Sequence, residues 1–164
     1  MIVMDASTAI LLAKADLLDE FIHQVTGPVV MPTSVKQECC ARDSLDAWLI
    51  GRAIQEKRIA VKSVAQRGLV EELSRKFALG AGEAAAIALA SGRKGALVAS
   101  DDRRAINACK LLRIPFTTAL SVLTRMWEKG ALTKKEALAK LEILARFGRY
   151  KEEMVAAVRQ RLEG

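Results

Sequence analysis

Acidic side chains follow two short apolar runs of the chain. Asp5 comes directly after the run Ile2–Met4, and Asp101 and Asp102 come after the run 96–99 with one residue between. Short apolar runs of this kind are typical of buried strands. Because ligands of an open parallel α/β sheet bind outside the carboxyl ends of its strands, we expect these acids at a ligand-binding edge.

Two glutamates are placed to reach the same edge. Glu38 lies seven residues beyond the apolar run 29–31, on a helical pattern that begins after Pro32. Glu83 opens the alanine-rich helical segment 84–90, which leads back to the sheet. Carboxylates gathered at one edge repel one another unless cations neutralise them. Such oxygen ligands suit Mg²⁺ or Mn²⁺, which keep several waters and bind substrate phosphates.

Each acid also has an ordinary structural explanation. Aspartate is a favoured helix N-cap, which would account for Asp5, Asp101 or Asp102. Glu83, in a first helical turn, would interact favourably with the helix dipole. Glu38 would fit a solvated helix face. It is therefore the joint placement of the acids, and none of them singly, that indicates a site.

Apolar runs alternate with helical patterns along the whole chain. Strands are expected at residues 2–4, 29–31, 59–64, 96–99 and 115–117. Helices are expected from an N-cap at Ser7 or Thr8 to Val25, and over residues 35–52, 70–77, 83–90, 106–112, 120–128, 134–146 and 150–162. This alternation predicts an α/β fold of three layers, with a central parallel sheet between two layers of helices.

The chain is expected to form a single domain over residues 1–164, because no repeat or linker divides it. Its core would span residues 1–117, and a helical C-terminal extension would cover residues 118–164. Thr133 and Glu136 have the spacing of a capping box for the middle helix of this extension.

Composition restricts the classes of protein that the chain can belong to. The 164 residues are 51% hydrophobic but only 4% aromatic, so an aliphatic, alanine-rich core is expected. The net charge is +7, which suits a polyanionic partner and equally suits simple solubility. Three cysteines without CxxC spacing argue against a zinc site. With no apolar run long enough for a bilayer and no basic stretch at the start, a cytoplasmic protein without a membrane anchor is expected.

Other classes that begin with a strand ending in aspartate fit less well. A phosphatase of the phosphoaspartyl class would need a second acid at position 7, where this chain has Ser7. A dinucleotide-binding protein would need a glycine-rich first turn, and residues 5–8 contain no glycine. The single histidine, His23, has apolar helical neighbours, which argues against histidine-based catalysis.

Four segments of the chain together resemble the motifs of PIN-domain ribonucleases. These are a strand with its aspartate at 2–7, a strand, proline and glutamate-bearing helix at 29–38, an acid opening a small-residue helix at 82–90, and a strand with a Ser-x-Asp turn at 97–104. Their order, spacing and local pattern are similar to those of the family over residues 1–117. The chain most resembles a branch that is described as a domain of unknown function.

The resemblance implies a metal-dependent endoribonuclease that hydrolyses RNA phosphodiester bonds. Its catalytic carboxylates would be Asp5, Glu38, Glu83 and Asp102. The ligands of Mg²⁺ or Mn²⁺ would be Asp5, Glu83, Asp102 and Asp101. The Ser-x-Asp pattern favours Asp102 as the inner ligand and Asp101 as an outer helper or helix cap. Glu83 departs from the aspartate that many PIN toxins carry, and its longer side chain would shift a metal ion.

Four polar residues beside these acids would support catalysis. Ser7 and Ser100 would bond a phosphate oxygen or orient an acid, although a helix cap would explain either serine equally well. Arg103 and Arg104 follow the fourth acid and would hold the RNA backbone, or else lie on a solvated helix face.

RNA is the substrate that the resemblance implies, and it also suggests partners. Many PIN domains of this size act as toxins that a small antitoxin protein holds in check, and others process RNA without a partner. Homodimers are common in the family, and the face formed by Leu120, Leu123, Met126 and Trp127 would serve either a dimer or the core. The alternative function is a non-catalytic PIN-fold module that binds RNA or protein. Four intact acids argue against it, because a pure binding surface has no use for clustered negative charge.

Overall fold

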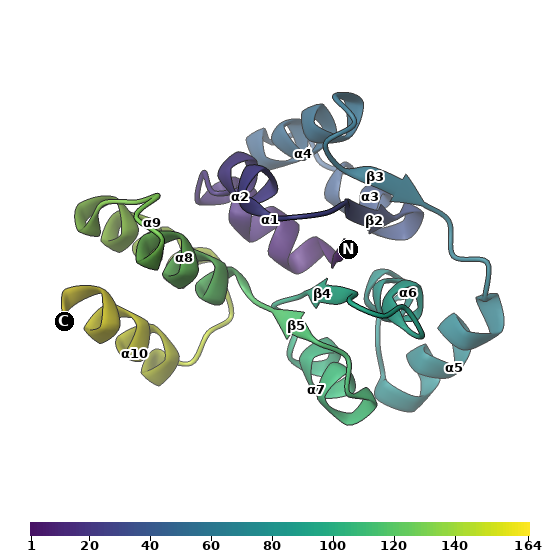
Figure 1. Cartoon of the computed structure of the whole chain (residues 1–164). Coiled ribbons are helices and arrows are strands. Elements are labelled where there is room, and N and C mark those ends of the chain that lie inside the picture. Colours follow the sequence, from purple (N-terminus) through teal and green to yellow (C-terminus); the bar gives the residue numbers. More distant parts are fainter.

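Five parallel strands form the centre of the computed structural model, which describes residues 1–164 (Figure 1). The strands lie in the order β3-β2-β1-β4-β5 and span Ile2–Met4 (β1), Val29–Pro32 (β2), Ala60–Lys62 (β3), Leu97–Ala99 (β4) and Phe116–Thr117 (β5). The helices are Ala6–Lys14 (α1), Leu18–Gln24 (α2), Thr33–Cys39 (α3), Leu45–Gln55 (α4), Arg67–Phe77 (α5), Ala81–Ala90 (α6), Arg103–Leu112 (α7), Ala119–Glu128 (α8), Lys134–Phe147 (α9) and Glu152–Glu163 (α10). The predicted parallel sheet between helices is confirmed.

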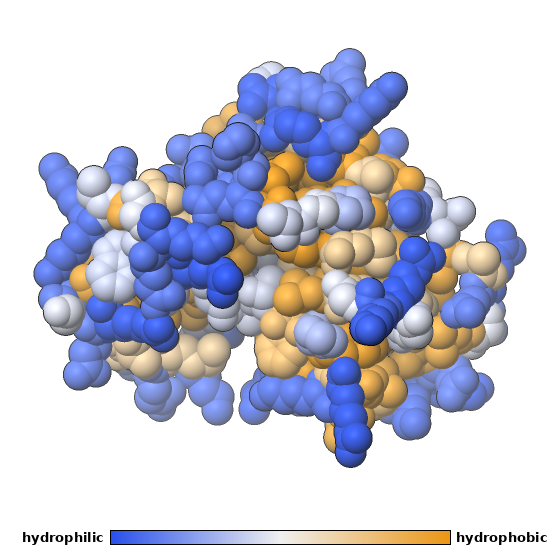
Figure 2. Space-filling model, viewed as in Figure 1, coloured by the Kyte–Doolittle hydropathy of each residue, from blue (hydrophilic) through white to orange (hydrophobic).

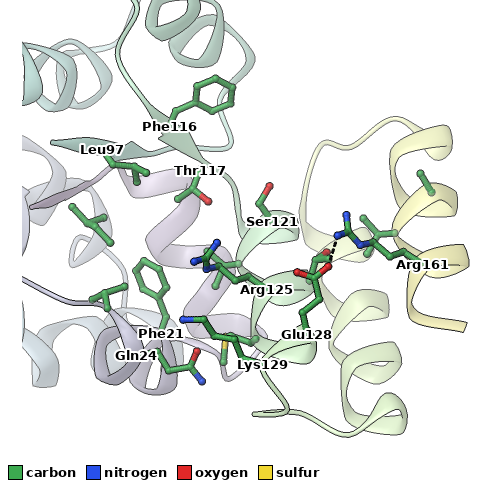
Figure 3. A pocket seen from close by; sticks show the side chains of 17 residues that line it. Phe21, Gln24, Leu97, Phe116, Thr117, Ser121, Arg125, Glu128, Lys129 and Arg161 are labelled. Carbon is green, nitrogen blue, oxygen red and sulfur yellow. Dashed lines mark hydrogen bonds and ion pairs between the residues drawn. The ribbon is translucent and has the colours of Figure 1, made fainter. Parts of the chain in front are cut away.

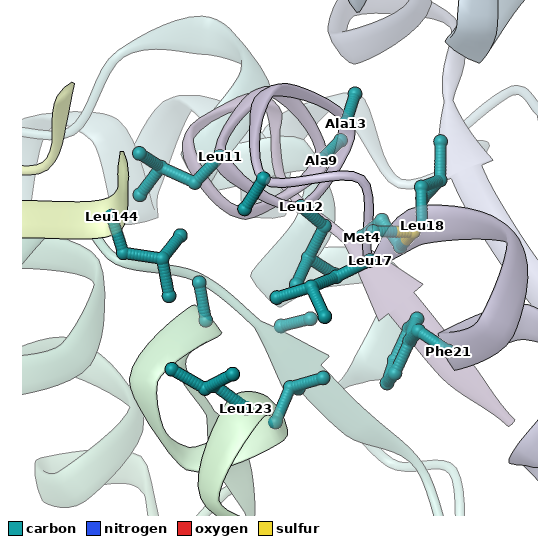
Figure 4. Close-up of a cluster of buried hydrophobic side chains, with 14 of the residues drawn as sticks. Met4, Ala9, Leu11, Leu12, Ala13, Leu17, Leu18, Phe21, Leu123 and Leu144 are labelled. Carbon is teal, nitrogen blue, oxygen red and sulfur yellow. The ribbon is translucent and has the colours of Figure 1, made fainter. Parts of the chain in front are cut away.

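The two faces of the sheet bury separate apolar clusters, because successive strand residues point to opposite faces. Met4 and Ala99 belong to the larger cluster, to which α1, α2 and α8 contribute (Figure 4). Val3 and Val98 belong to the smaller cluster, which α5, α6 and α7 complete. Fully burying an aliphatic side chain such as Leu12 stabilises the fold by about 1.5–3 kcal/mol. The predicted aliphatic and alanine-rich core is therefore present on both faces.

Two helices that the sequence predicted as continuous are each divided. The first breaks after α1, where Asp16 adopts a left-handed backbone with φ of 53°. Lys140 of α9 donates hydrogen bonds of 3.0 and 2.9 Å to the carbonyl oxygens of Ala15 and Asp16, which the break leaves without helical partners. The second breaks between α3 and α4, where Ser44 caps the new helix by accepting from the N–H of Ala47. The apolar spacing continues across both breaks, so periodicity alone did not reveal them.

The start of α1 also differs from the prediction. Its N-cap is Asp5, whose carboxylate accepts from the backbone N–H of Ala6, and neither Ser7 nor Thr8 has this role. Both of those hydroxyl groups instead bond to aspartates.

The C-terminal extension packs on the same face of the sheet as α1 and α2 (Figure 1). The predicted capping box of Thr133 and Glu136 at the start of α9 is confirmed. Leu120, Leu123 and Met126 of α8 lie in the larger apolar cluster and are at most 4% exposed. The chain covers these three side chains with its own helices, so core packing, the other explanation of this face, accounts for them. None of the helices is long and apolar enough to cross a lipid bilayer.

Candidate active site

The side chain of Asp5 is buried where the neighbouring strands β1 and β4 end. It is 2% exposed, and its Oδ1 accepts a 2.7 Å hydrogen bond from the N–H of Ala6. Its Oδ2 accepts from the hydroxyls of Ser100 at 2.7 Å and Ser7 at 3.0 Å. Burial raises the pKa of Asp5, these hydrogen bonds oppose that rise, and the negative charge of Glu38 adds to it. The protein thus holds a desolvated carboxylate in a fixed orientation.

The pairing of β1 with β4 explains why Asp5 and Ser100 meet. Met4 is in register with Ala99, so the next residue of each strand emerges at the same level of the carboxyl edge. The chain order also reverses here, since β2 and β3 lie on one side of β1, and β4 and β5 on the other. Such a switch point leaves a crevice outside the strand ends, where ligands of doubly wound sheets bind.

Asp102 is the N-cap of α7. Its Oδ1 accepts from the N–H groups of Arg104 and Ala105 at 2.8 and 2.9 Å. Its own N–H donates to the hydroxyl of Ser100 at 3.2 Å, and the same hydroxyl donates to Asp5. Of the two aspartates that the sequence offered as the cap of this helix, Asp102 therefore has that role, and Asp101 does not.

The carboxylate of Asp101 is engaged by three other parts of the chain. It accepts hydrogen bonds from the hydroxyls of Thr8 in α1 and Tyr150 in the α9–α10 connection, each 2.5 Å long. It also accepts from the N–H of Ala119, the first residue of α8, at 2.9 Å. Burial raises the pKa of Asp101, and these bonds oppose the rise. All of these donors belong to other elements, so Asp101 ties α1, α8 and the α9–α10 connection to the turn after β4. The sequence indicated Asp101 as one of the metal ligands; its two oxygens are both engaged by the chain, whereas Oδ2 of Asp102 accepts no hydrogen bond.

Glu83 lies close enough to Asp5 and Asp102 for their charges to act on it. Its helix begins two residues earlier than predicted, and its Oε2 accepts a 2.8 Å hydrogen bond from the N–H of Gly80. Burial raises the pKa of this half-buried glutamate, and the negative charges of Asp102 and Asp5 raise it further. The bond from Gly80 and the positive charge of Arg104 lower it. Glu83 therefore shares an electrostatic environment with both aspartates.

Glu38 is exposed and reaches the same region because α3 packs closely on α6. The contact is at Gly82, where a Cβ atom would lie 3.1 Å from Oε2 of Glu38 and 3.2 Å from Cγ2 of Val35. Glycine at this position thus allows Glu38 to lie beside the first turn of α6, which carries Glu83. The structure brings all four predicted catalytic carboxylates, Asp5, Glu38, Glu83 and Asp102, to one edge of the sheet.

The donor atoms of this acid cluster, which we define as Asp5, Glu38, Glu83 and Asp102, are all carboxylate oxygens. Hard oxygen donors of this kind fit Mg²⁺ or Mn²⁺. Their negative charges raise the pKa values of two members of the cluster. Glu38 raises the pKa of Asp5, and Asp5 and Asp102 raise the pKa of Glu83. A divalent cation would relieve that repulsion. The side chains as placed form no group of three or more residues that could hold a metal ion.

The four supporting residues divide into two kinds. Ser7 and Ser100 both donate to Asp5, and they accept from the N–H groups of Asp101 and Asp102 respectively, so they orient an acid. Arg103 and Arg104 are both exposed at the start of α7, and Arg104 donates to the carbonyl oxygen of Ala78 at 3.1 Å.

A family model described as a PIN domain matches residues 1–163 of the chain. The name of this family marks it as a domain of unknown function. The chain belongs to the PIN domain family. Searches of curated proteins and of solved structures each found no match. PIN domains are generally nucleases and typically use divalent metal ions. The acid cluster of this PIN domain lies at the carboxyl edge of the sheet, at the switch point between β1 and β4.

A large hollow of this PIN domain lies elsewhere. It measures about 740 Å³ and is bordered by α2, α8, α10 and the starts of β1 and β4 (Figure 3). Its lining includes the apolar side chains of Phe21, Leu97 and Phe116 and the basic side chains of Arg125 and Lys129. On one face of the molecule, apolar side chains gather between hydrophilic margins (Figure 2). Because none of the four acids of the acid cluster lines the hollow, the acid cluster and not the hollow is the candidate active site.

The roles of three residues around the acid cluster were not predicted from the sequence. Thr8 and Tyr150 hold Asp101, and Gly82 admits Glu38. Nothing in their local sequence indicates these roles, because each depends on a contact with a distant segment. The only available signal was that Tyr150 is the single tyrosine of the chain.

Proposed function

We propose that this PIN domain is an endoribonuclease that hydrolyses RNA phosphodiester bonds with the help of Mg²⁺ or Mn²⁺. The observation that supports it best is the buried Asp5, fixed by two serines at the strand switch point, with three other carboxylates around it. A carboxylate that is desolvated and surrounded by like charge destabilises the fold, and such groups concentrate at functional sites.

Each residue of the acid cluster has a definite part in this proposal. Asp5, Glu83 and Asp102 would hold the cation, which when bound lowers the pKa of a water molecule and neutralises charge on the scissile phosphate. The exposed Glu38 would accept a proton from the attacking water. Ser7 and Ser100 favour the ionised form of Asp5 and fix its orientation by donating to its Oδ2.

The RNA backbone would lie beside the start of α7. Arg103 and Arg104 are exposed there, and the charge of Arg104 already acts on Glu83. Guanidinium groups bind phosphate oxygens with two parallel hydrogen bonds. The net charge of +7 adds a general attraction for a polyanion that weakens with salt.

The test is cleavage of a labelled single-stranded RNA with Mg²⁺ or Mn²⁺, compared with excess chelator. We expect cleavage only with metal, and a loss of at least ~100-fold in rate for Asp5→Asn, because a metal contact contributes several kcal/mol and each ~1.4 kcal/mol is tenfold. The matched control is Asp43→Asn, an exposed acid outside the cluster, which should stay within about twofold of the wild type.

Cleavage that survives exhaustive chelation, or that Asp5→Asn leaves intact, would contradict the proposal. RNA binding without any cleavage would indicate the non-catalytic binding module instead.

A further inference from the structure

Tyr150 links the C-terminal extension to the turn that carries the fourth acid. It lies in the short connection between α9 and α10, and its hydroxyl donates to Oδ1 of Asp101 at 2.5 Å across 49 residues of sequence. Asp101 stands between Ser100 and Asp102, which bond to Asp5 and cap α7. The tyrosine therefore reaches the backbone segment on which the acid cluster depends.

The connection is shaped so that the tyrosine ring can fold back toward the sheet. A Cβ atom on Gly148 would lie 2.2 Å from Cε2 of Tyr150 and 2.7 Å from the carbonyl oxygen of Leu144. No side chain larger than hydrogen fits there unless both the ring and the end of α9 shift. Gly148 and Tyr150 thus form a pair in which the glycine makes room for the ring that bonds to Asp101.

Bonds continue from Asp101 to the acid cluster. The N–H of Asp101 donates to the Ser7 hydroxyl at 3.0 Å, and that hydroxyl donates to Oδ2 of Asp5 at 3.0 Å. The hydroxyl of Thr8 holds the Asp101 carboxylate from the same turn of α1. A looser Asp101 side chain would therefore weaken the hydrogen bond from the N–H of Asp101 to the Ser7 hydroxyl. The hydrogen bond from that hydroxyl to Asp5, one of the two that orient the carboxylate, would weaken with it.

We propose that Tyr150 is a positioning residue of the active site, which fixes the turn Ser100–Asp102 through its bond to Asp101. The inference rests on the proposed function and extends it, because it makes the extension a part of the catalytic apparatus. In Figure 1 the helices α8, α9 and α10 gather on one side of the sheet, and two of their contacts to the turn come from Ala119 and Tyr150.

A simple packing role for Tyr150 gives a different expectation. A packing residue would lower stability on substitution and leave the catalytic parameters unchanged well below the melting temperature. A positioning residue would lower kcat and raise the metal concentration for half-maximal rate, because the fourth acid is less well placed. The KM for RNA would stay the same, since the arginines of α7 are untouched.

The experiment compares Tyr150→Phe, which removes one oxygen atom, with Gly148→Ala, which displaces the ring and also presses on the end of α9. Arg149→Lys, an exposed neighbour of unchanged charge, is the control. Kinetics are measured with Mn²⁺ and labelled RNA, at least 20 °C below each melting temperature. We expect kcat to fall about tenfold for Tyr150→Phe and more for Gly148→Ala, with KM within about twofold of the wild type.

Amide hydrogen exchange without metal or RNA provides a second, independent measurement. The N–H groups of Asp101 and Asp102 donate to serine hydroxyls, and both should exchange about tenfold faster in Tyr150→Phe. The N–H of Val98, bonded within the sheet, is the internal reference and should not change.

Unchanged exchange at both aspartate amides would overturn the positioning role, whatever the kinetics. Faster exchange with unchanged kcat and metal requirement would overturn it as well. If the wild type itself cuts no RNA, the proposed function fails, and the exchange measurement still decides whether Tyr150 holds the turn. Should Gly148→Ala not fold, Tyr150→Phe alone decides the outcome.

Discussion

The hydroxyl of Ser100 donates a 2.7 Å hydrogen bond to Oδ2 of Asp5, although 95 residues separate them in the chain. The bond follows from the register of β1 with β4, which places the residues after Met4 and Ala99 side by side. It lowers the pKa of a carboxyl group whose burial acts in the opposite direction. The balance between these two effects leads to the first two predictions.

Replacing Ser100 with alanine should weaken metal binding most at acidic pH. Loss of the hydroxyl raises the pKa of Asp5 further, and a proton then competes better with the cation for the carboxylate. We expect the Mn²⁺ concentration for half-maximal cleavage to rise about tenfold at pH 5.5 and clearly less at pH 8. The check is a metal titration of the RNA cleavage rate at both pH values. An equal change at the two pH values would show that Ser100 does not act through the ionisation of Asp5.

Asp5→Asn should stabilise the metal-free protein at neutral pH. Burial raises the pKa of Asp5 above its unfolded value of 3.8, so stability falls as pH rises from 3.8 through the folded pKa and stays low above it. Asparagine avoids this cost, since the hydroxyls of Ser7 and Ser100 can turn to accept from its amide. We expect a rise in melting temperature of about 3 °C at pH 7, and little or none below pH 4. Scanning calorimetry at both pH values measures it.

The same variant should lose its response to metal. Mn²⁺ bound to the acid cluster would raise the melting temperature of the wild type by mass action, and Asp5→Asn should abolish most of that rise. A variant that keeps the full response would place the cation away from Asp5.

The adjacent aspartates should differ in what their substitution damages. Asp102→Asn keeps the cap of α7, because the amide oxygen still accepts from Arg104 and Ala105, but it removes a charge from the acid cluster. We expect cleavage to fall by about 1,000-fold and the melting temperature to stay nearly constant.

Asp101→Asn should show the opposite pattern. Burial raises the pKa of Asp101 as it does that of Asp5, so asparagine also relieves the cost of a buried charge here. One of the two oxygens becomes an NH2 group, however, so the side chain can no longer accept from Thr8, Ala119 and Tyr150 together, and its remaining bonds lose their charge assistance. We expect the loss to exceed the relief, so the melting temperature should drop by about 5 °C. Cleavage should fall less than for Asp102→Asn. Single-turnover cleavage and thermal unfolding of both variants decide the matter. Greater loss of activity in Asp101→Asn, without loss of stability, would make Asp101 the metal ligand.

Gly82→Ala should separate α3 from α6 and move Glu38. The added methyl group would press on Oε2 of Glu38 and on Val35, each near 3.1–3.2 Å. We expect cleavage to drop about tenfold and stability by roughly 1–3 kcal/mol, the usual cost of overpacking. Gly68→Ala in α5 is the control: no atom lies within 4 Å of its Cβ position, so it should stabilise the helix by about 0.5–1 kcal/mol. Activity of Gly82→Ala equal to that of the control would remove Glu38 from the site.

Much of the fold is determined by local sequence. The apolar runs before Asp5 and Asp102 predicted β1 and β4, and the Thr133 spacing predicted the start of α9, because strand alternation and helix capping depend on neighbouring residues. The break at Asp16 was missed for the complementary reason. Its carbonyl groups are satisfied by Lys140, which is distant in sequence.

The types and order of the acids were also evident in the sequence, and with them the resemblance to PIN domains. Which oxygen each acid presents to the site was decided by the tertiary structure. Asp101 and Asp102 are adjacent and chemically identical, yet α8 and Tyr150 bind the first, and the second caps α7. Glu38 approaches the other acids only because Gly82 lets two helices touch. Contacts of this kind join residues far apart in the chain, so no local spacing encodes them, and only the packed structure determines which of two equal carboxylates is free to act.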